Sequence, residues 1–251
     1  MIFLTSDTHG QWYKRFNKKA FLQQKELTKE DYVIVLGDFG IMNYPDEWMQ
    51  LDWLDEQSFT TLFLAGNHSN YDYLDSLPVD EWHGGKVSFV RPSIIYMHRG
   101  QVYEINGLKF FAFGGASSHD IQDGILELTD PDYDKKRRRL NAEYACYRTN
   151  HVDWWAREIP SEAEMQEGWN NLKKHNYKVD YILTHCPYTA LLLSLNGSWK
   201  KYKSDILTEY LQGIEKKVEY KHWYFGHVHL NEEIEEVNAT CLYEQILKIC
   251  D

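Results

Sequence analysis

Cysteine and proline are scarce in this chain, and long apolar runs are missing. The 251 residues include six prolines and four cysteines. The cysteines are Cys146, Cys186, Cys241 and Cys250, which lie far apart and form no C-x-x-C pair. This spacing does not fit a small disulfide-bonded scaffold and favours reduced thiols, so we expect a cytoplasmic protein. No apolar stretch approaches the roughly 20 residues of a membrane-spanning helix, so we expect no membrane partner.

Positive charge is also in short supply. Lys and Arg total 27 against 38 Asp and Glu, which gives a formal net charge of -11. Nucleic-acid affinity depends largely on clustered Lys and Arg, so this balance argues against a general nucleic-acid binder. Any phosphate group must therefore be attracted locally. The hydrophobic share of 43% supplies a packed interior, and the length favours one domain over residues 1–251.

Short apolar runs alternate with segments of helical character. Residues 2–6, 32–36, 61–64 and 181–183 are apolar runs that end at Gly, Asp or a polar motif, as buried strands do. Residues 14–29, 45–57 and 204–218 have helical character, and Ser161 followed by Glu164 predicts a capped helix start. This alternation predicts an α/β fold, with polar motifs on the loops after the strands.

Two later segments depart from the alternation. Residues 93–98, 101–105 and 108–113 are strand-like and separated by Arg99-Gly100 and Asn106-Gly107, which predicts an antiparallel meander. Residues 116–160 are polar and irregular, and we interpret them as a cap-like insertion within the domain. The basic run at 135–139 lies among many acids, so we expect a solvated helix face with ion pairs.

Five polar motifs follow one another in a fixed order along the chain. They are Asp7-Thr8-His9-Gly10, Gly37-Asp38, Gly66-Asn67-His68, Thr184-His185 and Gly226-His227-Val228-His229. In the first and last motifs the Asp and His side chains stand two residues apart, so an extended segment directs both to the same side. Carboxylate, amide and imidazole ligands without thiolates favour manganese, with iron, zinc or magnesium as alternatives.

The order and residue types of these motifs resemble the calcineurin-like metallophosphoesterase superfamily, of the bacterial or phage type. The resemblance implies a four-layer α/β/β/α sandwich of two mixed sheets flanked by helices, with a cap-like insertion. It also implies two divalent metal ions. By this resemblance Asp7, His9 and His229 hold one ion, Asn67, His185 and His227 hold the other, and Asp38 bridges both.

The implied reaction is hydrolysis of a phosphomonoester or phosphodiester by direct attack of a metal-bridging hydroxide. The bridging carboxylate Asp38 is then a catalytic residue. His68 is left over from the ligand count and is the candidate to protonate the departing alkoxide. Asn67 and His119, the latter in a Gly-rich loop at 114–120, are the expected substrate contacts.

The sequence departs from the pattern of protein phosphatases, which carry GDxxDRG and RGNHE. The matching positions hold Ile41, Met42, Ala65 and Ser69, so the Asp that orients the acid His and the Arg residues that grip a dianion are missing. A phosphodiester or a small phosphorylated molecule is therefore favoured over a phosphoprotein. The alternative from another class is a catalytically weak, phosphoesterase-like scaffold that binds a protein partner.

Overall fold

The computed structural model describes residues 1–41, 46–195 and 202–250. Two β-sheets make up its centre. The first sheet contains β1 (Ile2–Thr5), β2 (Tyr32–Val35), β3 (Thr60–Phe63), β4 (Asp80–Trp82), β5 (Gly85–Arg91), β6 (Ile94–Met97) and β15 (Leu247–Cys250), in the order β15-β1-β2-β3-β6-β5-β4. The second contains β7 (Gln101–Ile105), β8 (Leu108–Phe113), β11 (Tyr181–Thr184), β12 (His222–Phe225), β13 (Glu232–Ile234) and β14 (Ala239–Cys241), in the order β13-β14-β12-β11-β8-β7.

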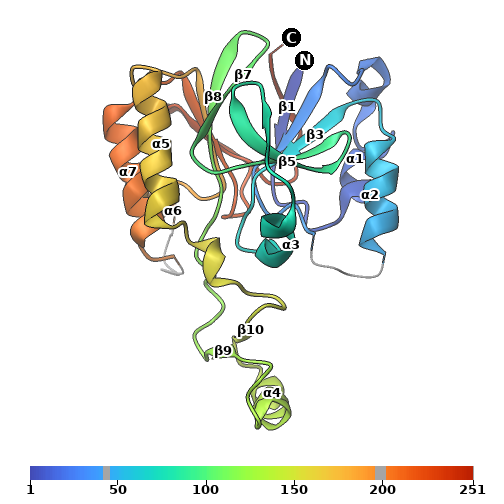
Figure 1. Cartoon of the computed structure of the whole chain (residues 1–251), viewed down its shortest axis with the longest axis vertical. Helices are drawn as coiled ribbons and strands as arrows, with labels where there is room; N and C mark the ends of the chain where they lie inside the picture. Colours follow the sequence, from blue (N-terminus) through green and yellow to red (C-terminus); the bar gives the residue numbers. More distant parts are fainter. Residues whose placement is uncertain (42–45, 196–201, 251) are drawn as a thin grey trace.

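Helices cover the outer face of each sheet (Figure 1). The first sheet carries α1 (Trp12–Phe16), α2 (Glu47–Asp55) and α3 (Tyr71–Ser76), and the second carries α5 (Glu162–Lys174), α6 (Thr189–Leu195) and α7 (Ile206–Lys217). Short 3-10 turns lie at Leu22–Glu26, Ala156–Glu158 and Glu235–Val237. The expected four-layer α/β/β/α arrangement of two mixed sheets is therefore confirmed.

Alternation along single strands explains why four layers form. In β1, Ile2 and Leu4 belong to the core between the two sheets, while Phe3 belongs to the core under α1 and α2. In β8, Phe110 points to the core between the sheets and Phe111 to the core under α5 and α7. Successive strand side chains leave opposite faces, so a continuously apolar strand needs cover on both sides.

The expected meander is only partly correct. β7 and β8 form an antiparallel hairpin around Asn106-Gly107, as expected, and β5 pairs with β6. However, β6 and β7 belong to different sheets, because the chain crosses from one sheet to the other at Arg99-Gly100. Gly100 has φ +73°, and an added Cβ would lie 2.8 Å from the backbone of Gly168 in α5. The crossing therefore depends on glycine, and local sequence does not distinguish it from a hairpin turn.

The helix expected over residues 14–29 is also wrong in length. It ends at Phe16, and after a turn the chain continues as the 3-10 segment Leu22–Glu26. Asn17 ends it, because its amide donates to the carbonyls of Tyr13 and Lys14 and its oxygen accepts from Lys19 and Ala20. Such local side-chain bonds compete with helical backbone bonds.

The other expected helices are present. The helix expected over 45–57 is α2, with position 45 outside the described residues, and the one expected over 204–218 is α7. Ser161 and Glu164 form the expected capping box at the start of α5.

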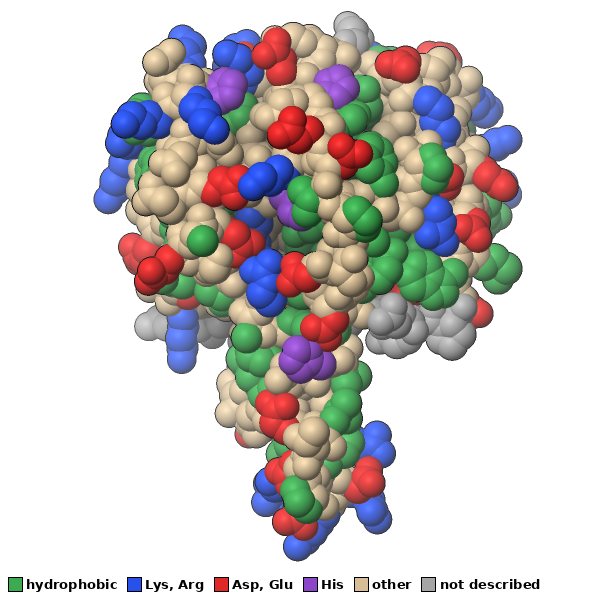
Figure 2. Space-filling view, viewed as in Figure 1, with side chains coloured by type: hydrophobic (Ala, Val, Ile, Leu, Met, Phe, Trp, Pro, Cys, Tyr) green, Lys and Arg blue, Asp and Glu red, His purple; other side chains and the backbone are tan. Residues whose placement is uncertain are grey.

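The segment between β8 and α5 projects from the two sheets as an arm, drawn in yellow-green in Figure 1. It contains β9 (Ile125–Leu126), α4 (Tyr133–Ala142) and β10 (Arg148–Thr149). Lys136 pairs with Asp130 and Arg137 with Asp134, and Figure 2 shows charges of both signs mixed at the tip. The basic run thus lies on a solvated helix with ion pairs, as expected.

Among the described residues, no helix combines the length and the apolar character that crossing a membrane would require.

Candidate metal centre

The polar motifs lie just beyond the carboxyl ends of neighbouring strands. Asp7, Asp38 and Asn67 follow β1, β2 and β3, which pair in parallel in the first sheet. His185 and His227 follow β11 and β12, a parallel pair in the second sheet. Because the carboxyl ends of parallel strands meet at one edge, the motifs converge between the two sheets.

Glycines inside the motifs allow this convergence. A Cβ at Gly66 would lie 2.1 Å from Asp38 Oδ1, and a Cβ at Gly226 would lie 2.5 Å from Asp7 Oδ2. No side chain fits at such distances, so each glycine lets one strand end approach the polar side chain of its neighbour.

The backbone at the motifs is strained. Five motif residues have positive φ: Asp7 (51°), His9 (45°), Asp38 (46°), His227 (67°) and His229 (56°). Residues other than glycine rarely adopt this conformation, at a cost of about 1–3 kcal/mol each, and such strain concentrates at functional sites. The tight bends turn side chains from strand ends toward a common point.

One cluster of ligand atoms is formed by Asp7, His9 and His229. His229 Nε2 lies 3.2 Å from Asp7 Oδ1 and 3.3 Å from His9 Nε2. His9 Nε2 is 3.9 Å from Asp7 Oδ1. Three ligand atoms at these separations can all reach one small cation.

A second cluster is formed around His185. Its Nε2 lies 3.4 Å from Asp38 Oδ2 and 3.3 Å from Asn67 Oδ1. Its Nδ1 donates to the carbonyl of Leu36 at 2.7 Å, which fixes the ring and directs Nε2 toward the cluster. The ring of His227 lies beside it, with 5.1 Å between centroids.

Asp38 lies between the two clusters. Its Oδ2 is 3.4 Å from His185 Nε2 and 3.9 Å from His9 Nε2, so one carboxylate faces both groups. Burial raises the pKa of Asp38, but the charges of His185, His68 and His9 outweigh burial and hold that pKa well below its usual range. Burial lowers the pKa of His185, and Asp38 raises it more, to about 9. The His185 proton thus balances the Asp38 charge, and a metal cation can take its place.

The residues present fit a metal site. Asp7 Oδ1 is buried and accepts no hydrogen bond among the described residues. The nitrogens nearest to it are those of His229 and His9, the other members of the first cluster. A buried carboxylate oxygen that accepts no hydrogen bond is costly unless a cation lies beside it. Burial also lowers the pKa of His227 well below its ordinary value, so that ring is neutral, the form that binds metals.

His68 lies beside the clusters and is only partly buried. Its backbone N–H donates to Asp38 Oδ1 at 2.7 Å, and its ring lies 5.4 Å from that of His9. The same carboxylate that faces both clusters therefore also fixes the loop that carries His68.

The positions that distinguish protein phosphatases have structural roles here. Ile41 and Ala65 belong to the core under α1 and α2, where a charged side chain would be buried. Ser69 Oγ accepts from the backbone of Gly66 at 2.9 Å and closes the turn that carries Asn67. Met42 lies outside the described residues.

Comparison with protein families decides the family. Residues 1–231 match the calcineurin-like phosphoesterase family. The chain belongs to this family. The resemblance expected from the motifs is confirmed, and with it the expectation of a phosphoesterase domain. The possible metal-binding groups of the phosphoesterase lie at the strand ends that carry the motifs.

Similar proteins include lariat debranching enzymes. Lariat debranching enzyme A of Xenopus laevis is 29% identical over 144 residues, which are 51% of this chain and 25% of that protein. The lariat debranching enzyme of Schizosaccharomyces pombe is 23% identical over 221 residues, 81% of this chain and 44% of that protein. This chain therefore spans less than half the length of these curated relatives.

A solved structure, phosphopantetheinyl hydrolase from Mycobacterium tuberculosis, aligns over 96% of this chain and 87% of its own. The sequence identity is 13% and the TM-score 0.43, a likeness that supports no functional conclusion.

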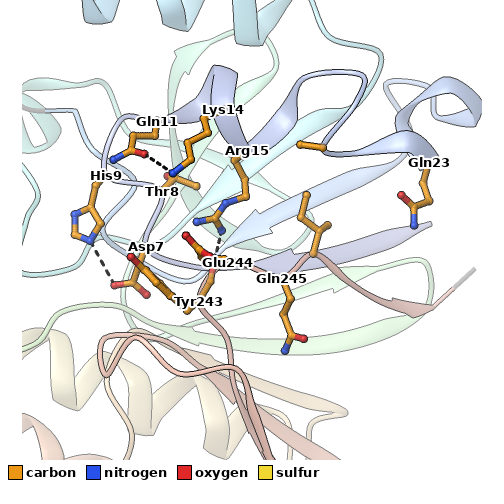
Figure 3. Close-up of a pocket in the computed structure, with 12 residues that line it drawn as sticks. Asp7, Thr8, His9, Gln11, Lys14, Arg15, Gln23, Tyr243, Glu244 and Gln245 are labelled. Atoms are coloured by element: carbon orange, nitrogen blue, oxygen red, sulfur yellow. Dashed lines mark hydrogen bonds and ion pairs between the residues drawn. The ribbon is translucent and has the colours of Figure 1, made fainter.

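Two pockets flank the candidate metal centre. One, of about 430 Å³, is lined by Asp7 and His9 of the first cluster (Figure 3). The other, of about 490 Å³, is lined by His227 and His119. The ring of His119 lies 5.9 Å from that of His227, so the structure brings this sequence candidate to the rim of the centre.

Sequence reasoning missed Arg148, a cation of the arm. It donates to Asp120 through Nε at 3.2 Å and through Nη2. Burial lowers the pKa of Arg148, but Asp120, Asp153 and Asp38 raise it above its ordinary value. Asp38 thus lies within electrostatic range of this arginine. No sequence pattern marks it, because its relation to the centre comes from the path of the arm.

Sequence reasoning also missed Tyr243. Its ring stacks on His229, with centroids 4.4 Å apart and planes at 12°. It comes from the loop before β15, and nothing in the flanking sequence distinguishes it from other surface tyrosines.

Proposed function

We propose that this protein is a phosphodiesterase that works with two divalent metal ions, most readily manganese. The observation that carries the proposal is the convergence of two ligand clusters on Asp38, beside the buried Oδ1 of Asp7, which accepts no hydrogen bond among the described residues. In a purely structural ion pair, a buried carboxylate oxygen normally accepts a hydrogen bond.

In this proposal the ligand assignment follows the family pattern. One ion is held by Asp7, His9 and His229, the other by Asn67, His185 and His227, and Asp38 is shared. The short distances that join His229 to Asp7 and His9, and His185 to Asp38 and Asn67, support this division. Asp7 also lies within reach of Asp38 and His185, so the two groups are adjacent. When bound, two such ions supply Lewis acidity for phosphoryl oxygens and activate a water molecule.

The chain itself supplies the acid and the positioning. His68 donates a proton to the departing alkoxide, a contribution of about 10² to 10⁴ in rate. Asp38 Oδ1, which accepts from the His68 backbone at 2.7 Å, holds that loop against the metal ligands. Asn67, beside His185, and His119, beside His227, contact the substrate phosphate or its ester group.

A phosphodiester is favoured over a monoester for two reasons. Pockets of about 430 and 490 Å³ flank the centre, one for each ester group of a diester. Relatives named as debranching enzymes also favour cleavage of a bond that joins two parts of a larger substrate.

We further propose that residues 1–251 form one domain, and that residues 116–160 are an insertion within it that contributes Arg148 to the rim of the centre. We also propose a cytoplasmic location, which the widely spaced cysteines favour.

Hydrolysis of a bis-aryl and a mono-aryl phosphate by the manganese-loaded protein tests the proposal. We expect a higher kcat/KM for the diester, and loss of turnover in Asp38→Asn and His68→Ala. His175→Ala, at the end of α5, is the matched control and should retain wild-type activity. Metal binding without turnover of either ester would favour the scaffold alternative.

A further inference from the structure

The pocket beside the first cluster contains two adjacent cationic side chains. We call it the Arg15 pocket, lined among others by Asp7, His9, Lys14, Arg15 and Tyr243. Figure 3 shows the ends of Lys14 and Arg15 on the side of the pocket where Thr8 and His9 lie. The proposed metal ligands therefore form one wall of this pocket.

Arg15 is anchored through one nitrogen only. Its Nη1 donates to Thr5 Oγ1, to the Ser6 carbonyl and to the Tyr243 carbonyl. These contacts tie the end of β1 to the loop before β15 and fix the guanidinium group in place. Nε and Nη2 donate to no acceptor within the part of the chain that the structure describes.

The charge of Arg15 is incompletely balanced. Burial lowers the pKa of Arg15, and the charges of Glu244 and Asp7 raise it only in part. Neither carboxylate forms an ion pair with it among the described residues, and Asp7 is a proposed metal ligand whose charge a metal would neutralise. A partly buried guanidinium whose N–H groups lack acceptors lowers the stability of the folded protein, unless an anion accepts hydrogen bonds from them.

Lys14 adds a second cation at the same wall. Its Nζ has one weak contact, to Gln11 Oε1 at 3.4 Å, and no ion pair among the described residues. Glu244 and Asp7 also line the pocket, but neither forms an ion pair with Lys14 or Arg15 among the described residues. The two neighbouring cations repel each other, so a bound anion would stabilise both.

The pocket is continuous with the metal centre through Tyr243. Its carbonyl accepts from Arg15, while its ring stacks on His229, which lies 3.2 Å from Asp7. A group in the Arg15 pocket therefore lies next to the first cluster without occupying it.

We propose that the Arg15 pocket binds a second phosphate of the substrate, separate from the phosphodiester that is cleaved. A phosphate matches the fork of Nε and Nη2, and Lys14 adds charge beside it. The substrate would thus be a phosphodiester with a further phosphate on the ester group next to Asp7 and His9. This inference rests on the proposed function for the position of the cleaved bond.

Nucleotide binding to the metal-loaded protein tests the inference without relying on turnover. Adenosine 3′,5′-bisphosphate and adenosine 5′-monophosphate are titrated by calorimetry, and chromatography afterwards checks that both are intact. We expect the bisphosphate to bind on the order of tenfold more tightly, since hydrogen bonds to charged groups contribute at this scale.

Variants separate a specific contact from a general charge effect. Arg15→Gln should abolish the preference and Lys14→Gln should reduce it about threefold or more, on the order of a single exposed charge contact. Lys18→Gln, which removes the same charge from an exposed residue lining a different hollow, should leave it unchanged. Because Arg15 also anchors two loops, thermal melting checks that its variant folds, and Lys14→Gln tests the pocket without touching that anchor.

Equal affinity of the wild type for both nucleotides, or a preference that survives both substitutions, would overturn the inference. Diester turnover without a bisphosphate preference would refute this inference alone. A preference without diester turnover would refute the proposed function alone.

Discussion

Replacing Gly66 with alanine puts a methyl group where the two clusters meet. The added Cβ would lie 2.1 Å from Asp38 Oδ1, 2.6 Å from the Asp38 backbone nitrogen and 2.6 Å from His185 Nε2. A side chain can rotate away, but the Asp38 backbone is fixed within the loop after β2. Gly66 does not need a positive φ, so the expected effect is steric and falls directly on the proposed ligands.

The size of the effect can be worked from these contacts. Over-packing costs about 1–3 kcal/mol, and loss of the bond from His68 N–H to Asp38 Oδ1 costs about 1.5–3 kcal/mol. We therefore expect the free energy of unfolding to fall by about 3–5 kcal/mol, which lowers Tm on the order of 10 °C for a chain of this size. Displacement of Asp38 and His185 should also lower metal affinity by about 10- to 100-fold.

Thermal melting with and without a chelator, together with metal content after dialysis, measures both effects. Gly213→Ala in α7 is the control, because its Cβ meets only Trp169, at an ordinary 3.4 Å. Alanine in a helix interior should stabilise it by about 0.5–1 kcal/mol. If Gly66→Ala keeps the wild-type Tm and metal content, the convergence of the two clusters at this glycine is not what the metal site requires.

Three further predictions concern single side chains. His68→Ala should lower kcat by about 10²- to 10⁴-fold and retain full metal content, with a larger loss for poorer leaving groups; equal loss for all leaving groups would exclude an acid role. Asp7→Asn should lower the metal bound per chain, measured by elemental analysis, because a neutral amide replaces a buried carboxylate whose Oδ1 accepts no hydrogen bond among the described residues; unchanged content would contradict its role as a ligand. Burial raises the pKa of Glu164, but Arg99, Ser161 and Arg157 lower it to about 2. Its stabilisation is therefore present above about pH 4.5 and is lost as the pH falls toward about 2, so Glu164→Gln should cost about 2–3 kcal/mol at neutral pH and little in acid. Melting curves at both pH values check this, with the exposed Glu162→Gln as control.

The expected positions of the motifs were correct because they depend on local rules. A short apolar run followed by Gly-Asp or Gly-Asn-His predicts a buried strand that ends at a polar loop, and Asp38 and Asn67 lie at such ends. Parallel strands then bring these loops to one edge. The capping box at Ser161 was also predictable, since its bonds join residues three apart.

Errors arose where the contacts of one particular residue, and not the hydrophobic pattern, decide the conformation. The local sequence at Arg99-Gly100 predicts a hairpin turn, yet this turn joins the two sheets because Gly100 packs on α5. The helix after Lys14 was expected to continue, but Asn17 caps it through its own side chain. Hydrophobic periodicity carries no information about the packing of Gly100 on α5 or about the side-chain hydrogen bonds of Asn17.

The sequence alone therefore determined the family, the layered α/β fold and the candidate metal ligands, because strand ends and motif residues follow local chemistry. The tertiary structure decided which of those residues lie close together, with Asp38 facing both His9 and His185, and it stacked Tyr243 on His229. It also showed that Arg15 is held by a loop 228 positions later, with two nitrogens unused. These contacts join segments far apart in the chain, and the packing of the two sheets alone sets the distances between those segments.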